Sequence, residues 1–189
     1  MNTIILRFFL TLLCASGMIF STVASAKDIS PESKESIKEM NDLLVKYFTD
    51  NCKGENYKAT CPAINELTPD GKFNTLAKHF VKNYHFFVFN DQWIWVGHGL
   101  YRKIIGGNHR DFQGADGHFF AQGFRKFADE YGEGYYPYSE AKSFGGYKNI
   151  AYLHQLVLKD GSKLIFATCY NTPEKLIDKD LLKNLKSKN

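Results

Sequence analysis

The 189-residue sequence has little of what marks fibrous, disordered or multi-span membrane proteins. It contains 5 prolines and 15 glycines, too few for a collagen-like fibre, and its net charge is only +4, unlike a highly charged disordered chain. After the first 26 residues, no apolar run approaches the roughly 20 residues that a membrane-spanning helix needs. Because 44% of the residues are apolar, we expect one globular domain with one sizeable core. The mild charge gives no reason to expect a nucleic-acid partner.

The sequence also lacks the short motifs that identify common hydrolases and metalloenzymes. Its six histidines form no HExxH pair, and no GxSxG is present. Asp111 and Asp116 lack the further oxygen ligands and the closing glutamate of a calcium loop. We therefore predict no enzymatic activity, no catalytic residue, no metal and no cofactor. A metal-dependent enzyme built from histidines and aspartates far apart in the chain is the alternative.

The first 26 residues are typical of a secretory signal peptide. Arg7 precedes a largely apolar run from Phe8 to Phe20, and an A-x-A cleavage site ends at Ala26. The run of about 13 residues is too short to cross a bilayer as a helix, although an uncleaved anchor is the alternative. We expect an exported, periplasmic chain that keeps no membrane span after cleavage.

Three cysteines remain after the expected cleavage. Cys52 and Cys61 flank a polar loop, and export permits oxidation, so we predict a disulfide between them. In the chain-entropy account, such a bridge contributes about 2.7 kcal/mol. Cys169 lies in an apolar run typical of a buried strand, so we expect a buried, unreactive thiol.

The spacing of apolar residues predicts an α+β domain on an antiparallel sheet of about five strands. The expected helices cover residues 31–48, 68–83, 117–130 and a basic amphipathic stretch at 173–188. The expected strands cover residues 84–89, 93–96, 133–139, 148–158 and 163–170. Leu76 and Phe119 are expected on buried helix faces, and Asp116 is expected to cap the third helix. Asp160 and Gly161 predict a two-residue hairpin turn.

Between Gly97 and Gly117 lies an irregular stretch with six glycines, which we call loop 97–117. Long ordered loops in compact domains are usually functional, so this loop is a candidate for covering a site.

Short segments between Tyr84 and Tyr170 resemble, in order, those of the bacterial single Cache domains, which are extracytoplasmic, PAS-like small-molecule sensors. The matching segments are Phe86–Asn90 with the family's FFVYD strand, Val96–His98 with AHP, Ile105–Asn108, Asp111 and Ala115–Gly117 with GKN…D…DADG, Gly132–Tyr138 with GGGWVEY, Lys148–Tyr152 with KxxxY, and Ala167–Tyr170 with SGIY. Gly99 and Thr168 depart from the pattern, standing where the family has proline and glycine.

The resemblance implies a domain organisation of a signal peptide (1–26), a single Cache domain (27–172) and a basic C-terminal helix (173–189). The family's usual transmembrane helix and output domain are not found. The resemblance therefore implies a stand-alone exported form that acts through a partner protein.

The resemblance also implies a ligand pocket between one sheet face and loop 97–117. Its expected polar residues are His98, Tyr136, Tyr138, Lys148 and Tyr152, with Asn108 and Tyr101 from the loop. Lys148 would pair with a carboxylate, so the expected ligand is a small carboxylate-bearing metabolite or an amino acid. Alternatively, Tyr136 and Tyr152 are core tyrosines and Lys148 is a solvated strand end. The rival function is an envelope interaction protein with a degenerate pocket.

Overall fold

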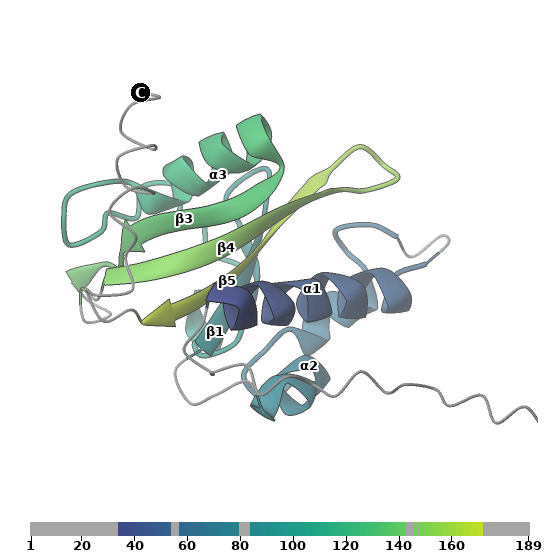
Figure 1. The fold of residues 1–189 in the computed structure, drawn as a ribbon. Helices are drawn as coiled ribbons and strands as arrows, with labels where there is room; N and C mark the ends of the chain where they lie inside the picture. The colour runs from purple at the N-terminus through teal and green to yellow at the C-terminus, as the bar shows by residue number, and fades with distance from the viewer. Residues whose placement is uncertain (1–33, 54–56, 80–83, 143–145, 147, 172–189) are drawn as a thin grey trace, which may run out of the picture.

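The computed structural model describes residues 34–53, 57–79, 84–142, 146 and 148–171. These residues form a five-stranded sheet with strand order β2-β1-β5-β4-β3, in which all neighbouring strands are antiparallel (Figure 1). The strands are β1 (Tyr84–Asn90), β2 (Trp95–His98), β3 (Glu133–Ser139), β4 (Lys148–Val157) and β5 (Lys163–Asn171). The predicted α+β fold with an antiparallel sheet of about five strands is confirmed.

Helices pack on both faces of the sheet (Figure 1). The helices are α1 (Lys34–Asn51), α2 (Lys72–Leu76) and α3 (Phe120–Tyr131), with short 3-10 helices η2 (Pro62–Glu66), η3 (Ala77–His79) and η4 (Arg102–Ile104). Buried residues of α1 and α2 form one apolar cluster with one sheet face, and buried residues of α3 form a second cluster with the other. We call these the α1 face and the α3 face of the sheet.

Strand β1 explains why the sheet has two apolar faces. It lies between β2 and β5, and its side chains alternate between the two clusters. Phe86 and Val88 belong to the α1 face, whereas Phe87 and Phe89 belong to the α3 face. A strand covered on both sides reads as a continuous apolar run, which is why the run from Tyr84 predicted it correctly.

Helix α1 is fastened to the sheet by one buried polar side chain as well as by its apolar stripe. Asn41 is fully buried, and its Nδ2 donates to the backbone oxygens of Tyr152 and Phe166 at 3.1 and 3.0 Å. Nδ2 also donates to Oγ1 of Thr168 at 3.3 Å, so Thr168 faces α1. The amide therefore joins α1 to β4 and β5 together.

We expect Asn41→Ala to lower the free energy of unfolding by about 2 kcal/mol, because three buried acceptors lose their donor. Chemical denaturation followed by circular dichroism measures the change. The exposed neighbour Glu39→Ala is the matched control on the same helix and should stay within about 0.5 kcal/mol of wild type. Equal effects of the two substitutions would contradict this role of Asn41.

The predicted disulfide and the predicted burial of Cys169 are confirmed. Cys52 and Cys61 form a disulfide with their Cα atoms 5.8 Å apart, and both are buried in the cluster on the α1 face. Cys169 is a free, buried cysteine of β5. Burial raises the pKa of its thiol, so Cys169 stays protonated and unreactive.

The second predicted helix, over residues 68–83, is wrong at its start, and its predicted end at residues 80–83 lies outside the described residues. The chain turns at Thr68–Gly71, and α2 begins only at Lys72 and ends at Leu76. A Cβ on Gly71 would lie 2.0 Å from the backbone oxygen of Glu66, so this close approach of the backbone needs glycine and delays the helix. Leu76 was expected to be buried and is 51% exposed.

The third helix begins three residues later than predicted, at Phe120 rather than Gly117. Asp116 does not cap it, because its Oδ1 accepts the N–H of His118 and closes a local turn instead. The residue at the N-cap position is Phe119, which was expected to be buried and is 43% exposed. Asx turns compete with helix starts in this way.

Two hairpins also differ in detail from the prediction. The return strand β2 begins at Trp95 and not at Trp93, whose φ is +57°. The β4–β5 turn is longer than two residues, because the N–H of Leu158 donates to Ser162 and Gly161 has a positive φ. A three-residue loop that ends in a left-handed glycine is a common alternative hairpin.

The predicted signal peptide (1–26) and C-terminal helix (173–188) lie outside the described residues. The first predicted helix, 31–48, is described from Lys34 and continues to Asn51. Of the helices in the described ranges, none is long and apolar enough to cross a membrane.

Candidate functional site

A small, partly open cavity lies on the α3 face of the sheet, beneath the start of loop 97–117. Its volume is about 20 Å³, room for about one water molecule. Aromatic side chains such as Phe87 and Phe120 form much of its wall. Its polar lining residues are His85, Trp95, His98, Tyr101, Tyr138 and Glu140.

His98 stands at the end of β2, where the loop begins. Its Nδ1 accepts the backbone N–H groups of Leu100 and Tyr101 at 3.0 and 3.1 Å. An Nδ1 that accepts two hydrogen bonds carries no proton, so the hydrogen bonding assigns the neutral ring's proton to Nε2. The buried ring therefore offers Nε2–H as its donor.

The environment of His98 holds its ring in the neutral form. Its ring centroid lies 5.9 Å from that of His85, 5.2 Å from Trp95 and 6.1 Å from Phe87. Burial lowers the pKa of His98 well below its usual range, and repulsion from His85 and His109 lowers it further.

His85 and Glu140 form a second buried polar pair beside His98. His85 Nε2 lies 3.5 Å from Glu140 Oε1, and both side chains are mostly buried. Burial lowers the pKa of His85 to about 4 and raises the pKa of Glu140. Since burial penalises both charged forms, it favours a neutral histidine next to a carboxyl group that is harder to ionise than usual.

Trp95 contributes a donor that is not satisfied in this arrangement. Its Nε1 is buried and finds no hydrogen-bond partner among the residues that the structure describes. A buried N–H without an acceptor costs about 1–3 kcal/mol. An acceptor atom of a bound molecule that reached this N–H would therefore gain a hydrogen bond.

Trp95 and His98 reach the same face because of a β-bulge. Phe87 pairs with His98 and Val88 with Gly97, but the register then shifts and Phe89 pairs with Trp95. Residues three apart on a regular strand point to opposite faces, and the extra residue in β2 brings both rings to the cavity.

Of the residues predicted for the pocket, His98, Tyr101 and Tyr138 line the cavity. Tyr136 lies on the same sheet face, but its ring packs against Phe124 and Phe127 of α3, at 5.3 and 5.6 Å. It belongs to the cluster on the α3 face and is not one of the cavity's lining residues.

Asn108, Lys148 and Tyr152 lie elsewhere. Asn108 Nδ2 donates to the backbone oxygen of Gln92 at 3.0 Å, which joins the loop to the β1–β2 turn. Lys148 is exposed at the start of β4, opposite Ser139. Tyr152 packs in the cluster on the α1 face. Parity puts Lys148 on the face of Tyr152, so the structure separates both from His98 and Tyr138.

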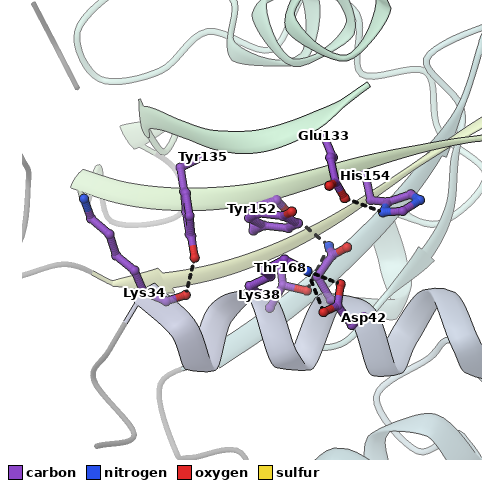
Figure 2. Close-up of polar contacts among 9 residues, drawn as sticks. Lys34, Lys38, Asp42, Glu133, Tyr135, Tyr152, His154 and Thr168 are labelled. Atoms are coloured by element: carbon purple, nitrogen blue, oxygen red, sulfur yellow. Dashed lines mark hydrogen bonds and ion pairs between the residues drawn. The ribbon is translucent and has the colours of Figure 1, made fainter. Parts of the chain in front are cut away.

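Figure 2 shows the surroundings of Tyr152 on the α1 face. Its ring meets that of Tyr135 edge-on at 4.9 Å, and Lys38 Nζ lies 5.2 Å from its centroid. The hydroxyl of Tyr135 donates to the backbone oxygen of Lys34 at 2.7 Å. Burial raises the pKa of Tyr135 to about 12, so this tyrosine stays protonated and joins the sheet to α1. Tyr152 therefore packs as the core tyrosine of the alternative interpretation.

Sequence reasoning missed His85, Trp95 and Glu140. Strand parity could have placed His85 on the same sheet face as Phe87, because the two are two residues apart on one strand. It could likewise have placed Glu140 on the face of Tyr138, two residues earlier at the end of β3. Trp95 could not have been found in this way, because the bulge sets its direction. In the described ranges, no group of three or more His, Cys, Asp or Glu is placed to hold a metal ion.

No family model matches this sequence, and no curated protein matches it. Solved structures to which this chain is similar include a "periplasmic sensor domain of chemotaxis protein". It is 15% identical with a TM-score of 0.44, over 73% of this chain and 87% of that chain. A "methyl-accepting chemotaxis protein from Vibrio parahaemolyticus RIMD 2210633" is 17% identical with a TM-score of 0.39, over 72% of this chain and 96% of that chain.

Proposed function

We propose that this chain is an exported, periplasmic, sensor-like module that binds a small carboxylate-bearing metabolite in the cavity beneath loop 97–117. The observation that carries the proposal is the indole N–H of Trp95 in the cavity lining, which finds no partner among the described residues, next to His98 with its Nε2–H. The disulfide and the signal-like N-terminus support export. The segments that resemble single Cache domains support the sensor assignment.

The ligand class follows from the donors. A carboxylate accepts from N–H groups, and a buried N–H bonded to a charged acceptor contributes about 1.5–3 kcal/mol. Trp95 and His98 take the role that we first expected of Lys148. Glu140 adds an acceptor in the same lining, so amino acids, whose ammonium group could donate to it, belong to the class.

The size of the cavity implies movement on binding. About 20 Å³ holds one water, so a metabolite enters only if part of the wall moves outward. Tyr101 is the exposed part of this wall, 41% accessible to solvent. Binding would therefore displace the start of the loop, and a partner protein would read that change.

The test is a thermal-shift screen of the mature, oxidised protein against small carboxylates and amino acids at pH 7.5. A ligand at 100 times its Kd adds about 2.7 kcal/mol, which raises Tm by about 5–10 °C. Trp95→Phe keeps the ring but removes the donor, and should weaken binding at least about tenfold. Trp93→Phe, outside the cavity lining, is the matched control and should keep the wild-type shift.

Lys148→Ala separates the present proposal from the first expectation. We expect it to keep the wild-type shift, because Lys148 starts β4 on the other sheet face. A flat screen of the wild type, with no co-purified small molecule by mass spectrometry, would overturn the binding proposal.

The rival function, an envelope interaction protein, is favoured by one observation. Aromatic side chains of the described residues fill the α3 face closely, and the cavity beside His98 is water-sized. Deleting residues 173–188 should then abolish function, while cavity variants stay silent. Metal analysis of the purified protein tests the metal-dependent enzyme directly.

A further inference from the structure

The outer wall of the cavity is a short flap, residues 100–105, suspended between two backbone anchors. Before it, the N–H of Gly99 donates to the backbone oxygen of Phe86 at 2.8 Å. After it, the N–H of Gly106 donates to the backbone oxygen of Trp95 at 2.7 Å. The flap contributes Tyr101 and Ile104 to the cavity lining, so its displacement would open the cavity further to solvent.

Burial does little to hold the first part of this flap. Leu100 and Tyr101 are 51% and 41% exposed, although their backbone N–H groups both point to Nδ1 of His98. Arg102 pairs with Asp70, but both side chains are largely exposed, and exposed ion pairs contribute little. The imidazole nitrogen of His98 is therefore a buried acceptor that holds both backbone N–H groups at this end of the flap.

Two histidines hold the flap, one as a hydrogen-bond donor and the other as an acceptor. His109 Nε2 lies 2.8 Å from the backbone oxygen of Ile104, so it must donate, and it still donates after the ring is protonated. His98 Nδ1 accepts, so a proton placed there removes both bonds at once. Protonation therefore weakens only the fastening made by His98.

We propose that His98 is an acid-sensitive latch: when the flap opens, the freed Nδ1 takes up a proton and can no longer accept the two N–H groups, so acidification holds the flap open without any other ligand. The proton occupies the lone pair of Nδ1 that accepted the N–H groups of Leu100 and Tyr101. Protonated Nδ1 is itself a donor, so neither N–H group can bond to it. The latch itself does not depend on the proposed ligand, whereas its effect on ligand entry rests on the proposed function.

The groups that face His98 come from several elements. His85 on β1 and His109 in the loop oppose a positive charge on His98, the ring of Tyr101 lies 5.2 Å away, and burial keeps Tyr138 uncharged at neutral pH. Glu140, after β3, is the acidic group of the cavity lining and favours the imidazolium. Behind Tyr138, Cys169 on β5 stays a neutral thiol. Burial keeps the closed state neutral, so proton uptake follows opening.

The latch predicts the size of the response. If the freed ring titrates near pH 6.5 and the closed ring does not titrate, the opening equilibrium rises about tenfold between pH 7.5 and pH 5.5. Amide hydrogen exchange, corrected for the intrinsic rate, should show this loss of protection at Leu100 and Tyr101. The central β5 amides serve as the internal reference.

The variants separate the latch from general acid instability. His98→Asn keeps an acceptor oxygen near the Nδ1 position but does not titrate, so the two amides should stay protected at pH 5.5. His98→Ala should leave them unprotected at both pH values. His118→Asn, an exposed histidine of the loop stretch, is the matched control and should follow wild type.

Wild-type protection that stays constant from pH 7.5 to 5.5, or His98→Asn that follows the wild-type profile, would overturn the latch. Nitrogen chemical shifts that place the neutral ring's proton on Nδ1 would do so as well. These measurements use the ligand-free protein, so a negative result overturns the latch and leaves the proposed function untouched. A flat ligand screen would overturn the proposed function alone.

Discussion

Phe124→Ala should lower the free energy of unfolding by about 4 kcal/mol, because it removes the central ring of the cluster on the α3 face. Phe124 is fully buried on α3. Its ring lies 5.6 Å from Phe87, 4.9 Å from Tyr138 and 5.3 Å from Tyr136. The cost combines lost apolar burial with the void left among rings that cannot collapse fully. Denaturant unfolding at pH 7.5 measures it.

Phe119→Ala is the matched control at the start of the same helix. Phe119 is 43% exposed, so its truncation should cost less than about 1 kcal/mol. Equal losses for the two variants would contradict the assignment of Phe124 as the centre of this cluster. The void left by Phe124→Ala can also be detected by ligand binding, because apolar cavities of this kind bind small apolar molecules. Benzene should therefore raise the free energy of unfolding of Phe124→Ala but not that of wild type.

Acidification from pH 7.5 to 4.5 should destabilise the whole fold by about 2.5 kcal/mol through His85. Burial lowers its pKa in the folded state to about 4, whereas the unfolded chain titrates near 6.5. A folded pKa below the unfolded value means that the stabilisation is complete above pH 6.5. It is lost as the pH falls toward 4, because the unfolded state binds the proton first.

Two neighbours modify this loss in opposite directions. His98, whose pKa is also lowered by burial, adds to it. Glu140 has a raised pKa, so the folded state binds its proton first, and this group stabilises the fold as the pH falls through its titration. The net result remains destabilisation, because two histidines oppose one carboxyl group.

The measurement is the free energy of unfolding in denaturant at pH 7.5, 6.5, 5.5 and 4.5. His85→Gln should flatten the dependence, while His118→Gln, which removes an exposed histidine, should leave it as in wild type. A wild-type protein that is equally stable at pH 7.5 and 4.5 would refute the neutral, buried state of His85.

Patterns within short stretches determined most of the secondary structure. The apolar run of β1 and the spacing of Cys52 and Cys61 both act over fewer than about a dozen residues, and the structure bears them out. The helix starts at residues 68 and 117 failed for an equally local reason. Gly71 and Asp116 make turns that compete with the helix, and spacing alone does not weigh that competition.

The sequence by itself therefore determined an α+β domain with five strands, a disulfide, a buried Cys169 and a loop beside His98. Only the tertiary structure decided which polar side chains meet. Antiparallel register pairs Tyr135 with Tyr152 on the α1 face, and a one-residue bulge brings Trp95 and His98 together on the other. Backbone hydrogen bonds between paired strands fix that register, and shifting it by one residue moves every side chain to the opposite face.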